Sequence, residues 1–169
     1  MVIVIVLLCA GLAWFSSFPV RYQARAVADI QRVGGEIFYD YQLTSGNFVK
    51  EDARIPATKW QRELLGDHYF IRPSSINLAG KNVSDNDVRD FCLLRGVKFL
   101  RLNNTQISDL AASDLVKMRS LETLELGSTK LTDKGLQILI GLPNLKVLNI
   151  YGTGVTPVSL YTSPSPRDS

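Results

Sequence analysis

The sequence has 169 residues, of which 46% are hydrophobic and 21% are charged, and its formal net charge is +3. This length predicts one modest domain, and so small a positive excess argues against nucleic acid as a partner, because nucleic-acid-binding proteins usually carry a clustered basic face. One histidine, His68, and two dissimilar cysteines, Cys9 and Cys92, form no zinc-ligand cluster and no disulfide framework. We therefore expect no metal and no cofactor.

Residues 1–20 contain no charged side chain. At ~1.5 Å per residue, twenty helical residues reach ~30 Å, the thickness of a bilayer core, so we predict a single membrane-spanning anchor. The alternative is a cleaved signal peptide, but the stretch has no basic start, and its only small-x-small site near the end of the apolar run is Gly11-Leu12-Ala13. If Met1 is the true start, Arg21 and Arg25 favour a cytoplasmic location for the rest of the chain. Otherwise the sequence does not determine on which side of the membrane the rest of the chain lies.

Residues 21–72 have the pattern of a juxtamembrane helix followed by an α/β cap. Apolar residues recur on one helical face over residues 22–33, and Gly34 is typical of a helix end. Alternation over residues 36–41 predicts a strand, and after a polar loop residues 60–65 predict a second short helix. Such a unit would cover the N-terminal end of a repeat array.

Residues 73–157 repeat with a period of 24 residues, which is visible in the spacing of Leu78, Leu102, Leu126 and Ile150. The pattern is that of a leucine-rich repeat, L-x-x-L-x-L-x-x-(N/C)-x-L, with Thr where Asn is usual. Alternation predicts a short strand in each repeat, and the helical spacing that follows predicts a helix. We therefore expect an α/β solenoid, with parallel strands on the concave face, helices on the convex face and an incomplete last repeat.

Polar residues recur in each repeat at fixed places. Ser108 and Thr132, with Asp109 and Asp133 beside them, are residue types that cap helix N-termini. A recurring Asp is also compatible with metal ligation, but one Asp per repeat at a helix start favours capping. The hydroxyls at the inward turn are expected to bond loop backbone groups; they belong to Thr105, Thr129 and Thr153.

Five short motifs precede the repeats: Ala26-Val27, Gly34-Gly35-Glu36, Tyr39-Asp40-Tyr41, Leu64-Leu65-Gly66-Asp67 and Tyr69-Phe70. In this order, and followed by repeats with Ser/Thr-Asp, they resemble a family of bacterial membrane-anchored leucine-rich repeat proteins over about residues 1–157. The resemblance implies a hydrophobic anchor, a basic juxtamembrane helix, a cap and a solenoid. Members of that family usually have a basic stretch before the anchor, which this chain lacks.

The end of the sequence departs from the repeat. Thr156-Pro157 stands where Thr-Asp is expected, and residues 158–169 are rich in Ser and Pro. We expect this tail to be disordered and outside the fold, since it resembles translated sequencing-adapter read-through. The array would then be cut in mid-repeat.

The sequence contains no nucleophile–base pair, no paired-carboxylate site and no phosphate-binding glycine loop, so we expect a protein that is not an enzyme. The predicted function is a membrane-anchored interaction module that binds a protein or peptide on the concave face. The alternative is a regulatory or targeting segment of a larger enzyme or receptor. Arg101 and Glu125, on neighbouring strands, are also close enough to pair with each other. The candidate binding residues are Phe99, Arg101, Asn103, Thr123, Glu125, Val147, Asn149 and Tyr151.

Overall fold

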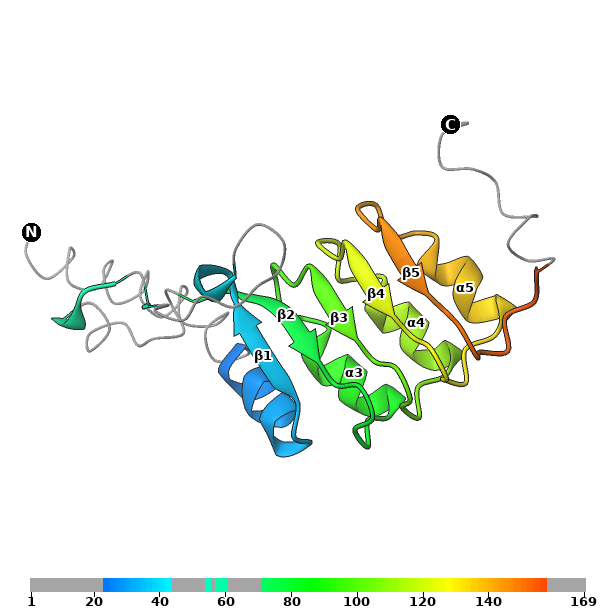
Figure 1. Cartoon of the computed structure of the whole chain (residues 1–169), viewed down its shortest axis with the longest axis horizontal. Helices are drawn as coiled ribbons and strands as arrows, with labels where there is room; N and C mark the ends of the chain where they lie inside the picture. Colours follow the sequence, from blue (N-terminus) through cyan, green and yellow to red (C-terminus); the bar gives the residue numbers. More distant parts are fainter. Residues whose placement is uncertain (1–22, 44–53, 56, 61–70, 158–169) are drawn as a thin grey trace, which may run out of the picture.

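The computed structural model describes residues 23–43, 54–55, 57–60 and 71–157, which form a mixed α/β fold around one five-stranded sheet (Figure 1). In chain order the elements are a helix over residues 23–32, β1 (Glu36–Tyr39), a 3-10 turn η1 (Asp40–Gln42), β2 (Pro73–Asn77), α3 (Asp85–Phe91), β3 (Phe99–Arg101), α4 (Asp109–Leu115), β4 (Thr123–Glu125), α5 (Asp133–Leu139) and β5 (Val147–Asn149). No helix within these ranges is both long and apolar enough to cross a membrane. The predicted anchor at residues 1–20, the tail at 158–169 and most of the short helix at 60–65 lie outside the described residues.

The strands pair in chain order, and the pairing follows the 24-residue period of the sequence. Strands β2 to β5 are parallel, with Leu100 aligned with Leu124 and Leu124 aligned with Leu148. Ile76, Leu100 and Leu124 have no exposed surface, so the alternation in the sequence correctly identified the inward face of each strand. Each unit of one strand and one helix therefore lies beside the next at a constant offset.

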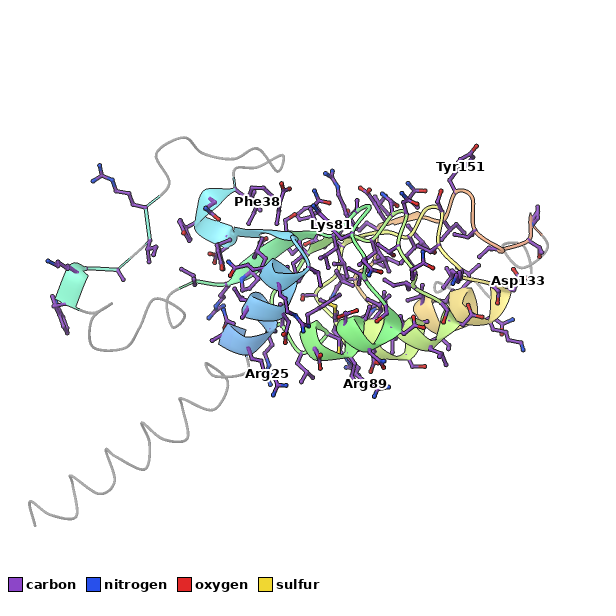
Figure 2. All side chains as sticks on the ribbon, turned by 90° about the horizontal axis from the view of Figure 1, so that it is seen from below. Arg25, Phe38, Lys81, Arg89, Asp133 and Tyr151 are labelled. Carbon is purple, nitrogen blue, oxygen red and sulfur yellow. The ribbon has the colours of Figure 1, made fainter. Side chains whose placement is uncertain are left out.

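The described helices lie on one face of the sheet, and none of them covers the other face (Figures 1 and 2). Helix α3 packs on α4, and α4 packs on α5. The apolar helical positions predicted from the sequence point into the space between helices and sheet, where they are all buried; they are Val88, Phe91, Leu94, Ala112, Leu115, Met118, Leu136, Leu139 and Leu142. Their burial joins the repeat units in one continuous core.

The N-terminal unit extends this core on the side of β2. The helix over residues 23–32 buries Ala26, Val27 and Ile30, and the Gln23 side-chain amide donates to the Ile71 carbonyl at 2.8 Å. Gly34 follows with a φ of 75°, a left-handed conformation that glycine adopts without strain. The predicted helix and its glycine end are confirmed.

Strand β1 is shorter than the strand predicted over residues 36–41. It runs antiparallel to β2, with Glu36 opposite Asn77, and it ends at Tyr39 rather than at residue 41. The register shifts at Tyr39, whose N–H donates to the Gln42 side chain at 2.9 Å. This local bond closes a 3-10 turn in place of further strand, and the turn stacks the Tyr39 and Tyr41 rings at 6.1 Å between centroids.

The predicted caps are confirmed for the hydroxyl residues and wrong for the aspartates. Ser108 and Thr132 are the N-caps of α4 and α5 and accept from the N–H two residues on. Asp109 and Asp133 lie in the first helical turn, but their carboxylates bind residues of the next unit. The Asp109 carboxylate accepts from both the N–H and the hydroxyl of Thr132 in the next unit, at 2.7 and 2.6 Å.

The same clamp occurs at two further junctions between successive repeats. Asp85 accepts from the N–H and hydroxyl of Ser108 at 2.8 and 2.7 Å, and Asp133 accepts from those of Thr156 at 2.7 and 2.9 Å. In the clamps on Ser108 and Thr132 the carboxylate binds the N-cap residue of the neighbouring helix, because parallel stacking places successive helix starts side by side. The position therefore links two units instead of capping one.

The threonines at the inward turn have the predicted structural role. The hydroxyls of Thr105 and Thr129 are buried and donate to the carbonyls of Leu102 and Leu126 at 2.7 Å. Thr153 makes the equivalent bond to Ile150, also at 2.7 Å. Each hydroxyl satisfies a carbonyl that faces the core, where an unpaired polar group would be costly.

Candidate protein-binding face

The uncovered side of the sheet, which we call the open face, carries the side chains that alternate with the buried leucines. The parallel register aligns equivalent positions of the repeat in rows that cross the strands. Residues directly opposite each other on paired strands share a face, so β1 adds its own residues to these rows. All eight residues predicted as binding candidates belong to this face or to the turns that follow its strands.

The first row is mainly apolar, and we call it the apolar row. It consists of Phe38, Ser75, Phe99, Thr123 and Val147, one from each strand. Its two phenylalanines are half-buried and flank the small side chain of Ser75, and Val147 is 53% exposed. With strands ~4.8 Å apart, the row spans roughly 19 Å.

The second row, which we call the polar row, lies two residues further along each parallel strand. It consists of Glu36, Asn77, Arg101, Glu125 and Asn149. The Arg101 Nε donates to Glu125 at 3.1 Å, so the expected internal pair is present. The Asn103 amide donates to the other oxygen of Glu125 at 2.6 Å, and Asn77 donates to Glu36 at 3.0 Å.

Arg101 is the member of the polar row with the most unused hydrogen-bonding capacity. Its Nε is bonded, but its two terminal nitrogens have no partner in the part of the chain that the structure describes. The side chain is 54% exposed beside Phe99 of the same strand. A guanidinium fork in this position is suited to a carboxylate or a backbone carbonyl of a partner.

The turns that follow the strands carry a third set of equivalent residues, which are Asn103, Gly127 and Tyr151. Asn103 accepts from the Gly127 N–H at 2.7 Å, and a Cβ on Gly127 would lie 3.2 Å from the Tyr151 carbonyl. Gly127 therefore contributes close packing and no side chain. The Tyr151 ring is 85% exposed, and Figure 2 shows it and Phe38 on the side of the molecule away from Arg25 and Arg89.

A shared carboxylate borders the open face just before the strands. Glu122 lies 3.5 Å from the Lys98 ammonium and 2.8 Å from the Lys146 ammonium. The hydrogen bond from Lys146, with the charge of Lys98 beside it, outweighs desolvation and lowers the pKa of Glu122. The carboxylate thus stays ionised. Together with the two lysines it leaves a net charge of +1 at this border.

Reasoning from the sequence missed Glu36, Phe38, Ser75 and Asn77 as members of this face. The alternation in β1 was visible, but its antiparallel pairing with β2 decides which of its side chains join the rows. Ser75 and Asn77 occupy the same repeat positions as Phe99 and Arg101, so the 24-residue period was a signal that would have found them.

Other reactive groups are scattered in the described ranges. No cluster of three or more His, Cys, Asp or Glu side chains is placed there to hold a metal ion. The Cys92 thiol is buried and is not in a disulfide bond, and burial raises its pKa. Burial, and then the charge of Tyr41, likewise raises the pKa of Tyr39.

No protein-family model matches the sequence, and comparison with curated proteins yields no match. The fold and the open face are therefore the features from which a function can be inferred.

Proposed function

We propose that this chain is a leucine-rich repeat solenoid, anchored in a membrane by residues 1–20, that binds a protein or peptide on its open face. Three features support the solenoid: the constant 24-residue offset between parallel strands, the Thr hydroxyl bonds inside each turn and the Asp clamp between turns. The anchor is supported by the absence of charge over residues 1–20.

The observation that carries the binding proposal is the apolar row beside the polar row. Phe38, Phe99 and Val147 retain exposed surface on a face that no described helix covers, and Tyr151 extends it. Aromatic residues next to an arginine are the composition of binding hot spots. A partner segment that crosses the strands would place apolar side chains on one row and polar groups on the other.

An alternative function, as the regulatory or targeting segment of a larger enzyme or receptor, is favoured by the outer edge of β5. Leu148 and Ile150 are half-buried, whereas the equivalent Leu124 and Leu126 of the preceding unit have no exposed surface. A further repeat or domain stacked on β5 would bury them. Identifying the complete reading frame in the source genome would decide whether such a domain exists.

Photo-crosslinking in cells tests the binding proposal. Photo-reactive residues at Phe38, Phe99 and Tyr151 should capture the same partner, and the helix-side controls Gln137 and Lys134 should not. The purified partner should then bind the double variant Phe99→Ala/Arg101→Ala at least tenfold more weakly than wild type. Arg95 is an exposed arginine outside the open face, so the control variant Arg95→Ala should bind the partner as tightly as wild type. Capture only from the helix side would overturn the proposal.

A further inference from the structure

A small cavity opens on the helix side of the molecule, between the helix over residues 23–32 and α3. Its volume is about 230 Å³, below the ~300–1,000 Å³ of typical small-molecule sites. Figure 2 shows Arg25 and Arg89 pointing away from the sheet on this side. Six residues line the cavity: Arg25, Ala26, Asp29, Arg89, Asp90 and Leu93.

Both arginines keep the ends of their side chains available. Arg25 approaches Asp29 at 4.0 Å and Arg89 approaches Asp114 at 3.7 Å, in each case through Nε. Their terminal nitrogens have no partner among the residues that the structure describes, and the side chains are 80% and 72% exposed. Two such forks beside one cavity are suited to a phosphate group, which accepts paired hydrogen bonds from guanidinium.

The carboxylates of the cavity set a second condition on the ligand. Asp29 is shared with Arg32 at 3.5 Å, whereas Asp90 is exposed and makes no hydrogen bond or ion pair with the described residues. A ligand with only negative charge would be repelled by Asp90. A ligand with a phosphate and a nearby ammonium would match both signs.

The residue types also distinguish between kinds of ammonium. A quaternary ammonium is recognised by aromatic side chains, and none of the six lining residues is aromatic. A primary ammonium donates three hydrogen bonds, which a free carboxylate such as Asp90 accepts. The cavity therefore favours an ethanolamine over a choline group.

The position of the cavity in the chain identifies the source of such a ligand. Arg25 lies five residues after the uncharged stretch, and residues 23–25 are helical, so three extended steps and two helical steps allow a separation of at most ~14 Å. The polar headgroup layer on each side of a bilayer is roughly 5–7 Å thick. If residues 1–20 span a membrane, as in the proposed function, the cavity lies at or just above the lipid headgroups.

We propose that this cavity binds the headgroup of an ethanolamine phospholipid, with its phosphate on Arg25 and Arg89 and its ammonium on Asp90. Leu93, which also lines the cavity and is 56% exposed, would add an apolar contact to the bound headgroup. Such a contact would hold the repeat array in one orientation relative to the membrane.

Native mass spectrometry of the full chain in detergent tests the proposal. Phosphatidylethanolamine, phosphatidylcholine and phosphatidylglycerol with identical acyl chains are added separately, so that any contact with residues 1–20 is the same for all three. Wild type should retain the ethanolamine lipid at least fivefold more than either other lipid. Arg89→Ala should abolish this preference, and Asp90→Asn should remove the discrimination against phosphatidylglycerol.

Arg95→Ala is the matched control, because Arg95 is exposed in the same repeat and lies outside the cavity. Equal retention of the three lipids by wild type, or equal loss in Arg89→Ala and Arg95→Ala, would overturn the proposal. Carbonate extraction of membranes containing wild type tests the anchor separately. A chain that resists extraction but shows no headgroup preference would leave the anchor standing and exclude the cavity as a lipid site.

Discussion

Asp109 and Thr132 lie 23 residues apart in the chain, yet the Asp109 carboxylate binds both the backbone N–H and the hydroxyl of Thr132. Thr132 is also the N-cap of α5, so one residue connects the start of a helix with the preceding repeat unit. The clamp joins neighbouring units through polar contacts, and the aligned buried leucines join them through apolar contacts at the same fixed offset. Pro157 occupies the next equivalent position and has no side-chain acceptor, so the clamp cannot continue from there.

Asp109→Ala should lower the free energy of unfolding by about 1–2 kcal/mol, because it removes two charge-assisted hydrogen bonds from a half-buried site. Asp109→Asn should cost less, since an amide can still accept from the Thr132 N–H and donate to its hydroxyl. Urea unfolding of the full chain in detergent measures both. The exposed, helix-side variant Lys134→Ala is the control, and a loss of the same size in Lys134→Ala would contradict the clamp.

Leu124→Ala should cost roughly 2–5 kcal/mol of stability, because Leu124 has no exposed surface and a cavity would remain between two units. Val147→Ala, on the exposed apolar row, should cost about 0.5 kcal/mol or less. The same urea series compares them. Equal losses at the two positions would refute the assignment of inward and outward faces.

Gly35→Ala should destabilise the chain by about 1–3 kcal/mol, because a Cβ there would meet Leu78 at 2.5 Å and Ile30 at 2.8 Å, and both residues are fully packed. Gly34→Asn is the matched neighbour: its φ is positive but the nearest atom is 3.7 Å away, and Asn tolerates that conformation. Thermal unfolding should rank Gly35→Ala well below Gly34→Asn. The reverse order would mean that Gly35 does not lie against Leu78 and Ile30 as described.

Stability should fall as the pH drops below about 4. Burial alone would raise the pKa of Asp87, but hydrogen bonds from the Ser84 hydroxyl and N–H, together with the charge of Arg32, outweigh it and lower the pKa. A carboxyl with a lowered folded-state pKa stabilises the fold at pH above its unfolded value, and this contribution is lost as the pH falls through the folded-state pKa.

Urea midpoints at pH 6 and pH 3 measure this loss in wild type and in Asp87→Asn. The variant should have the lower midpoint at pH 6 and a smaller drop on acidification. A drop in Asp87→Asn as large as that in wild type would exclude Asp87 as a contributor to the pH dependence.

The repeat period allowed most of the fold to be predicted locally. Leu100, Leu124 and their equivalents recur at every second position with Leu102 and Leu126, and this alternation predicts a strand with one buried face. The helices, the helix end at Gly34 and the hydroxyl N-caps could also be predicted, because each of these features depends on residues close by in the chain. The candidate residues Phe99 and Arg101 followed from the same alternation, although binding at this face stays a prediction.

Only the tertiary structure decided which partners the polar groups have. Asp109 has the sequence context of a helix cap, and its bonds to Thr132 exist because stacking places two helix starts side by side. The antiparallel pairing of β1, which brings Phe38 and Glu36 to the open face, is likewise a contact with a segment far away in the chain. Local sequence specifies the elements because backbone geometry and alternation are short-range, whereas contacts between units depend on how those units stack.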